Sequence, residues 1–212
     1  MSITTHRIGA RAAAAVMAIG LAYVVVLTAG MVRHGFEEPI TDPILAVMEV
    51  LTLLSALPIL LLVATMAERA PTEQRLAARI ALAFATLFAG TTSAVHFVEL
   101  TATRQAGGGG LVWPSTAYAL ELLAWDVFLG IALLSAAATL HPRGRERTAR
   151  QALLFCGALC LVGTIGPLSG YMRLQLLGVF GYAVVLPIAA FLLWRLFSAE
   201  GSAAEAGGTS AG

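Results

Sequence analysis

Five ionisable side chains interrupt long apolar stretches of this sequence. They are Glu49, His96, Glu99, Glu121 and Asp126. A charged side chain inside a bilayer costs roughly 2.5 to 3.5 kcal/mol on insertion scales, so each of these residues needs a partner or a purpose. Carboxyl and imidazole groups transfer protons, attract cations and ligate metals. We therefore take these five residues as the centre of a candidate functional site.

Helical spacing extends this set, because residues three, four or seven positions apart share one face of a helix. Four polar stripes follow from it: Glu49 and Thr52; Thr92, His96, Glu99 and Thr103; Tyr118, Glu121 and Trp125; Tyr171, Gln175, Gly178 and Tyr182. Asp126 follows Glu121 by five residues, and the two side chains are therefore about 140° apart around a helix. We expect Glu121 to face a cavity and Asp126 to contact a different neighbour.

The expected site carries more negative than positive charge. Four carboxyl groups face one histidine, and Arg173, at the start of the last apolar stretch, is the nearest permanent cation. Like charges at close range in a medium of low dielectric constant cannot all stay ionised. Either some of the carboxyl groups are protonated, or a metal, a mobile proton or a charged ligand completes the site.

Several interpretations of this cluster remain open. In the first, a pocket binds a small molecule, a lipid or a cation, with these ligand-binding residues: Glu49, His96, Glu99, Tyr118, Glu121, Trp125, Asp126, Arg173 and Tyr182. In the second, the protein is an enzyme acting on a lipophilic substrate. Its acid and base would be drawn from His96, Glu99 and Glu121, or a metal would be held by Glu49, His96, Glu99 and Glu121.

A proton or cation pathway is a further possibility, although the inner halves of the apolar stretches hold almost no ionisable residue to carry a charge onward. In the last interpretation, the polar residues only hydrogen-bond between helices of a structural or accessory protein. The sequence points to no cofactor, and it does not decide between an enzyme, a carrier and an accessory protein.

The elements that carry these residues are predicted to be transmembrane helices. Hydrophobic residues make up 58% of the 212 residues and charged residues 12%, with a mean hydropathy of +0.85, whereas soluble domains carry about 25% charged residues. A helix needs about 20 apolar residues to cross a bilayer. Six stretches approach or exceed this length: 12–32, 43–66, 80–101, 117–140, 152–168 and 174–197. We expect an all-α bundle of six transmembrane helices, forming a single domain over residues 1–198.

The placement of arginines predicts the orientation of this bundle. With the N-terminus in the cytoplasm, ten arginines lie on the inner flanks and only three, Arg33, Arg104 and Arg173, on the outer flanks. Positive residues concentrate on the cytoplasmic side of membrane proteins. Both termini are therefore expected in the cytoplasm, with residues 199–212 as a disordered tail. The five ionisable residues then fall in the outer half of the membrane.

Other classes of protein fit the sequence poorly. A net charge of +1 and the absence of a separate basic patch argue against a nucleic-acid partner. Cys156 and Cys160 lie four residues apart within one apolar stretch, which is a poor geometry for a disulfide. The expected partners are the lipid bilayer and a small-molecule or lipid ligand, and the oligomeric state does not follow from the sequence.

Two segments resemble a group of uncharacterised bacterial multi-pass membrane proteins with six helices. They are SAVHFVEL at residues 93–100 and WPSTAYALELLAWDVF at residues 113–128, within a similar stretch from Glu38 to Asp126. The resemblance implies a location in the bacterial inner membrane. It carries no activity that could be transferred to this chain.

Overall fold

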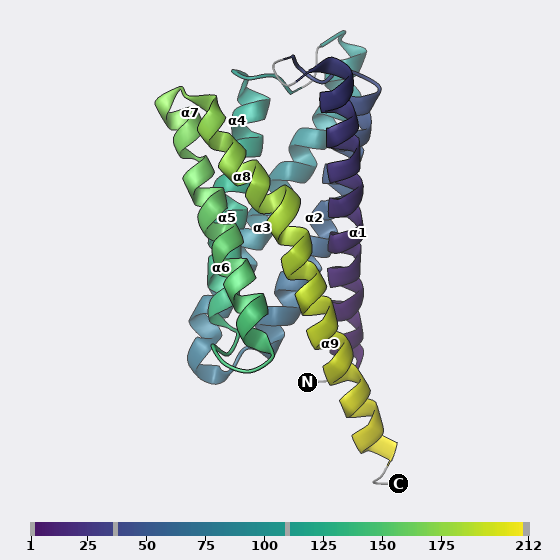
Figure 1. Ribbon diagram of the computed structural model, residues 1–212, viewed down its shortest axis with the longest axis vertical. Helices are drawn as coiled ribbons and strands as arrows, with labels where there is room; N and C mark the ends of the chain where they lie inside the picture. The colour runs from purple at the N-terminus through teal and green to yellow at the C-terminus, as the bar shows by residue number, and fades with distance from the viewer. Residues whose placement is uncertain (1–2, 36–37, 109–110, 210–212) are drawn as a thin grey trace.

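Every regular element that the structure describes is helical. The computed structural model describes residues 3–35, 38–108 and 111–209, and the elements in these ranges are helices joined by turns and loops. Six stretches of helix in them are long and apolar enough to cross a membrane. The chain is therefore an all-α, multi-pass membrane protein (Figure 1), which confirms the predicted fold class.

The six spans differ in how regular they are. Spans one and two are single α-helices, α1 (Ile3–His34) and α2 (Ile44–Arg69). Span three consists of a 3-10 turn (Thr72–Gln74), α3 (Arg75–Val98) and a π-helical turn (Glu99–Thr103). Span four consists of α4 (Thr116–Leu122), a π-helical turn (Leu123–Phe128) and α5 (Leu129–Ala138).

Spans five and six form a hairpin. Span five consists of α6 (Glu146–Gly163) and α7 (Ile165–Ser169). Span six consists of a 3-10 turn (Met172–Gln175), α8 (Leu176–Phe180), a π-helical turn (Gly181–Val185) and α9 (Leu186–Thr209). Gly170 joins the two spans with a φ of 74°, a left-handed conformation that glycine adopts without steric cost.

Two helices are longer than the apolar stretches from which they were predicted. Helix α1 begins at Ile3 rather than residue 12, and α9 continues past Phe197 as far as Thr209. The segment added to α9, residues 198–209, is rich in alanine, which has the highest helix propensity, whereas the segment added to α1 contains a single alanine. The division into a domain over residues 1–198 and a tail over residues 199–212 stays a prediction, and residues 210–212 lie outside the described part.

The spans form a ring in the order of the sequence. Helix α1 packs against α2, α2 against α3, α3 against α5, and α5 against α6, while α6 packs against α8 and α9. Helix α9 returns to α1 and closes the ring. Figure 1 shows both chain ends at the same end of the bundle, as an even number of spans requires. Which side of the membrane this end faces stays a prediction.

Glycines allow three of these helices to approach closely. A Cβ atom on Gly157 of α6 would lie 2.8 Å from the carbonyl oxygen of Gly130 in α5. A Cβ atom on Gly163 of α6 would lie 2.9 Å from the Cα atom of Gly178 in α8. Small residues at such crossings bring backbones together in membranes, where dispersion contacts rather than water exclusion hold helices.

A group of ion pairs ties the spans together at the end where the termini lie. Arg69, the last residue of α2, donates to Glu146 at 2.6 Å and from Nε to Glu200 at 3.1 Å. His6 of α1 lies 3.4 Å from the same Glu200 carboxylate. Glu200 belongs to the part of α9 beyond the apolar stretch. This contact gives a physical reason why the helix extends past Phe197.

Replacing Gly157 with alanine tests the α5–α6 crossing. We expect a loss of about 1–3 kcal/mol, because the new methyl group would overlap with backbone that cannot move without displacing a helix. The measurement is the thermal unfolding temperature in detergent, followed by circular dichroism. Gly90→Ala in α3 is the matched control, since a Cβ atom there has no heavy atom within 4 Å. Equal destabilisation by both variants would contradict the proposed crossing.

Candidate functional site

A cavity of about 460 Å³ lies inside the ring, in the half of the bundle away from the chain ends. Spans one, two, three, four and six line it, together with residues 39–40 and 111–113 of two connections. Most of the lining residues are aliphatic or aromatic, for example Ile19, Leu27 and Leu186. The contribution of span one was not predicted from the sequence. Because all polar stripes lie on other spans, α1 supplies mainly the apolar wall.

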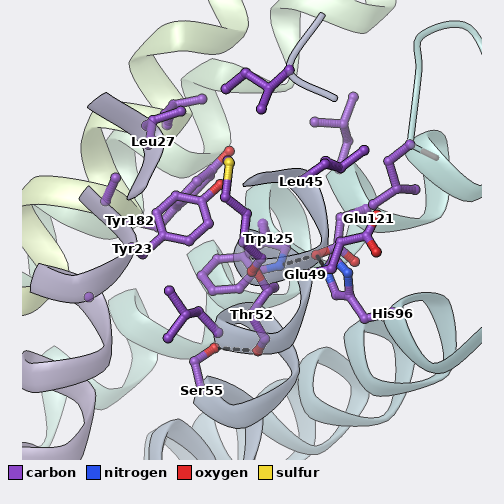
Figure 2. Close-up of a pocket in the computed structure, with 18 of the residues that line it drawn as sticks. Tyr23, Leu27, Leu45, Glu49, Thr52, Ser55, His96, Glu121, Trp125 and Tyr182 are labelled. Atoms are coloured by element: carbon purple, nitrogen blue, oxygen red, sulfur yellow. Dashed lines mark hydrogen bonds and ion pairs between the residues drawn. The ribbon is translucent and has the colours of Figure 1, made fainter. Parts of the chain in front are cut away.

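Glu121 is the centre of a hydrogen-bond network at one end of the cavity (Figure 2). Its Oε1 atom lies 2.7 Å from His96 Nε2 and accepts a hydrogen bond of 2.8 Å from Thr92 Oγ1. The indole Nε1 of Trp125 also donates to Glu121 Oε1, and it lies 3.0 Å from Thr92 Oγ1. The network joins spans three and four. It contains Thr92 and His96 of the stripe predicted on span three, and Glu121 and Trp125 of the stripe predicted on span four.

The nitrogen assignment of His96 follows from this network. A carboxylate accepts hydrogen bonds only, so the Nε2 atom that faces Glu121 carries the proton, and Nδ1 of the neutral ring is an acceptor. Nδ1 is buried and has no hydrogen-bond partner among the described residues. The His96–Glu121 pair is thus an imidazole oriented by a carboxylate.

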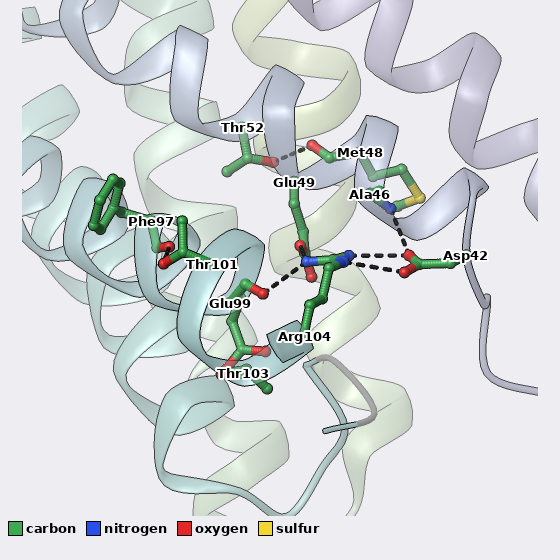
Figure 3. Close-up of polar contacts among 10 residues, drawn as sticks. All are labelled: Asp42, Ala46, Met48, Glu49, Thr52, Phe97, Glu99, Thr101, Thr103 and Arg104. Atoms are coloured by element: carbon green, nitrogen blue, oxygen red, sulfur yellow. Dashed lines mark hydrogen bonds and ion pairs between the residues drawn. The ribbon is translucent and has the colours of Figure 1, made fainter. Parts of the chain in front are cut away.

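Arg104 forms a second network, which Figure 3 shows between the start of span two and the end of span three. Its Nη1 atom donates to Glu49 Oε2 at 2.6 Å and to the backbone oxygen of Glu99 at 2.8 Å. Its Nε and Nη2 atoms donate to the two Asp42 oxygens, both at 3.0 Å. A planar guanidinium matches a carboxylate in this two-pronged way. Arg104 therefore holds the start of span two to the end of span three.

The sequence predicted Arg173 as the nearest permanent cation of the cluster, but in the structure Arg104 pairs directly with Glu49. Arg104 makes ion pairs with Glu49 and Asp42, whereas Arg173 lies in the turn before α8 and is not among the residues that line the cavity. The topological count had placed both arginines on the outer flanks without distinguishing them. Arg104 follows the last turn of span three, and from this position its long side chain reaches a carboxylate buried in span two.

Asp126 is fully buried away from the cavity. Its side chain packs against the glycines of spans five and six, so that a Cβ atom on Gly178 would lie 2.5 Å from Asp126 Oδ1. Neither carboxyl oxygen has a hydrogen-bond partner among the described residues. Glu121 borders the cavity and Asp126 does not. The angular separation of the two residues predicts this arrangement.

Only some of the predicted ligand-binding residues line the cavity. Six of the nine line it: Glu49, His96, Tyr118, Glu121, Trp125 and Tyr182. Glu99 is buried beside it and accepts from Thr103 Oγ1 at 3.3 Å, while Asp126 and Arg173 lie elsewhere. Whether the six bind a ligand, and whether His96, Glu99 or Glu121 is catalytic, stay predictions.

The four candidate metal ligands do not converge. Glu49 is paired with Arg104, and His96 is paired with Glu121. In the part of the chain that the structure describes, no group of three or more His, Cys, Asp and Glu residues has an arrangement that could hold a metal ion. The guanidinium of Arg104 already pairs with Glu49, and whether Glu49, His96, Glu99 or Glu121 ligates a metal stays a prediction.

Each of the three π-helical turns carries residues of this region. Glu99 lies in the first, Trp125 and Asp126 in the second, and Tyr182 in the third. A π-helical turn inserts one extra residue and rotates the side chains that follow it, and such turns are frequent at functional sites. The ring centroids of Trp125 and Tyr182 lie 4.9 Å apart, and both residues line the cavity.

Three residues of the region were missed in the sequence. Arg104 and Asp42 lie outside the apolar stretches, and Tyr23 is the single polar side chain facing the cavity from α1. One signal was present, because Arg104 is an exception to the concentration of arginines on the inner flanks.

No protein-family model matches this chain, and neither does any curated protein or solved structure with which it was compared.

Replacing Arg104 with glutamine should destabilise the bundle by about 3–5 kcal/mol, because it leaves the buried Glu49 carboxylate, 2% exposed, without its cation. Combining Arg104→Gln with Glu49→Gln should restore part of this loss, since the buried position 49 then carries no charge and only the half-exposed Asp42 loses its partner. Thermal unfolding in detergent measures both effects. The control is Arg33→Gln at the exposed end of α1, which should change stability by less than about 0.5 kcal/mol. An Arg104→Gln variant as stable as this control would refute the role of the ion pair.

Acid should weaken the Arg104 network by protonating Asp42. The hydrogen bonds from Arg104 hold the pKa of the Asp42 carboxyl below its ordinary value of 3.8. Its stabilisation is therefore fully present above about pH 3.8 and is lost as the pH falls through the lower pKa of the folded protein. Because the Asp42 side chain is 53% exposed, the effect should stay below about 1 kcal/mol. The difference in unfolding temperature between wild type and Asp42→Asn should vanish in acid, and a constant difference would contradict this.

Proposed function

We propose that this chain is a bacterial inner-membrane protein that binds a small amphipathic molecule or lipid in the cavity between its spans. With both termini in the cytoplasm, the cavity lies in the outer half of the membrane. The observation that carries the proposal is a cavity with mostly apolar walls and one cluster of polar and ionisable side chains, which we call the polar end. The polar end consists of Glu49, Thr52, His96, Glu121 and Trp125.

The size and lining of the cavity fit a ligand of this kind. Its volume of about 460 Å³ lies within the range of about 300 to 1,000 Å³ that is usual for small-molecule sites. Such sites combine apolar walls, which hold the body of the ligand, with a few polar groups, which orient it. A lipid or lipophilic molecule can enter from the bilayer without crossing water, so the site needs no opening to the aqueous phase.

The polar end is also better suited to a ligand than to packing alone. Interhelical hydrogen bonds explain the Thr92, His96 and Glu121 contacts, but they do not explain an unfilled space beside them. Side chains normally fill the interior of a bundle to high density. A bound molecule would restore this density and would lie against the Glu121 network.

The His96–Glu121 pair favours acid–base chemistry on the bound molecule as a second candidate function. A histidine oriented by a carboxylate is the arrangement that proton transfer requires. Against it, the His96 side chain is only 4% exposed and its second nitrogen is buried. A base that a substrate cannot reach in this geometry supports binding more strongly than catalysis.

Filling the cavity from α2 tests the binding proposal. Ser55 is 7% exposed and lines the cavity, with its hydroxyl bonded to the carbonyl oxygen of Thr52 at 2.7 Å. Ser55→Leu should reduce the amount of bound molecule by about tenfold, because it places apolar atoms in the ligand space. Ser55→Ala removes the same hydroxyl without filling the space and should retain the ligand.

The measurement is native mass spectrometry of protein extracted with its surrounding lipid in polymer-bounded discs. The proposal predicts a molecule that stays bound to wild type and to Ser55→Ala, and that is depleted in Ser55→Leu. Wild-type protein without any retained molecule would refute it. So would equal occupancy of all three proteins, because the retained molecule would then lie outside the cavity.

A further inference from the structure

The charge of the cavity wall restricts the class of ligand. The carboxyl and imidazole side chains that border it are Glu49, Glu121 and His96, and none of the described lining residues is an arginine. The sequence contains no lysine. Arg104 neutralises Glu49 from behind the wall. Glu121 is therefore the carboxylate at the cavity whose charge no arginine balances.

Of the two carboxylate oxygens of Glu121, Oε2 makes fewer hydrogen bonds than Oε1. Oε1 accepts from three groups, whereas Oε2 receives only a 3.1 Å contact from Thr92 Oγ1. That hydroxyl has a single hydrogen, and its contact with Oε1 is shorter at 2.8 Å. An ionised carboxylate offers about four lone-pair positions. Glu121 Oε2 can thus accept further hydrogen bonds.

Glu121 is also the charged group that a ligand can reach most easily. Its side chain is 14% exposed, against 4% for His96 and 2% for Glu49. Behind it, His96 Nδ1 and Glu49 Oε1 are buried acceptors without a partner among the described residues. This end of the cavity therefore has a surplus of acceptors and of negative charge. A molecule that brings hydrogen-bond donors and a positive charge would satisfy both.

Aromatic rings line the same cavity. Trp125, Tyr182, Tyr118 and Tyr23 all border it, and Figure 2 shows Trp125 between the Glu121 network and the rings of Tyr23 and Tyr182. The face of an aromatic ring attracts cations, and the attraction is larger when water is excluded. Aromatic rings and a carboxylate together select a cation over a neutral or negative group.

We propose that the ligand is a lipophilic amine, bound as its protonated ammonium ion. Its N–H groups donate to Glu121 Oε2, and its apolar body lies against the aliphatic residues of spans one, two and six. This inference rests on the proposed function, since it names the class of molecule that the cavity holds. A carboxylate ligand would be repelled by Glu121, an alcohol would leave the charge unbalanced, and a quaternary ammonium ion would bring charge without a donor.

Four probes with the same twelve-carbon chain separate these classes: dodecylamine, dodecanol, dodecyltrimethylammonium and dodecanoate. Binding is followed by tryptophan fluorescence, because Trp125 donates to Glu121. The protein is held in nanodiscs of zwitterionic lipid, and empty nanodiscs correct for partition into the bilayer. The amine should bind about tenfold more tightly than the alcohol, as expected for hydrogen bonds to a charged group. The quaternary ion should bind more weakly than the amine, and the carboxylate least.

Glu121→Gln and Glu73→Gln form a matched pair of variants. Glutamine at position 121 keeps the shape and an acceptor oxygen but removes the charge, so amine binding should fall about tenfold and alcohol binding should not change. Glu73 is an exposed residue of the 3-10 turn Thr72–Gln74 and is not among the lining residues. Its replacement should leave both affinities unchanged. Unchanged alcohol binding also shows that each variant is folded.

The outcomes distinguish this inference from the proposal on which it rests. If wild-type protein binds the alcohol as tightly as the amine, the amine assignment is overturned, while the binding cavity stands. Equal loss of amine binding in both glutamine variants overturns the role of Glu121. The wild-type ratio of amine to alcohol decides the question even if Glu121→Gln does not fold. If no probe binds, the amine assignment falls, and native mass spectrometry of the Ser55 variants decides separately whether the cavity holds another molecule.

Discussion

A carboxylate inside an apolar bundle must find hydrogen-bond donors on other spans, because lipid tails offer none. In this protein, that constraint is met by two networks that share no side chain. Arg104 satisfies Glu49 from the end of span three, and His96, Thr92 and Trp125 satisfy Glu121. Spans two, three and four are thereby held at fixed depth relative to one another. The positions of the polar groups at the cavity follow from this arrangement.

The closed ring of spans and the close helix crossings explain why space remains between the helices at one end. Glycines bring α5, α6 and α8 into backbone contact on one side of the bundle. On the other side, residues of α1 and α2 line the cavity of about 460 Å³. Fully packed interiors are the rule. The cavity is thus the part of the molecule in which a ligand can contribute to packing.

The chemistry of the site follows from how its charges are already paired. Glu49 has its cation, so it adds little net attraction for another one. Glu121 has hydrogen-bond donors but no arginine, and its second oxygen retains hydrogen-bond capacity. The candidate metal ligands are divided between the two networks, since Glu49 pairs with Arg104 and His96 pairs with Glu121. A ligand with positive charge and N–H donors complements what remains.

Composition and periodicity alone determined the membrane class, the number of spans and the depth of the polar residues, since these depend on local properties of each segment. They also separated Glu121 from Asp126, because both lie on one helix whose geometry is known. The partners across helices could not be obtained in this way. That Arg104 rather than Arg173 meets Glu49, and that Tyr23 borders the cavity, depends on which spans become neighbours and how their π-helical turns rotate. Only tertiary packing decides those contacts, because many helix arrangements bury the same apolar surface equally well.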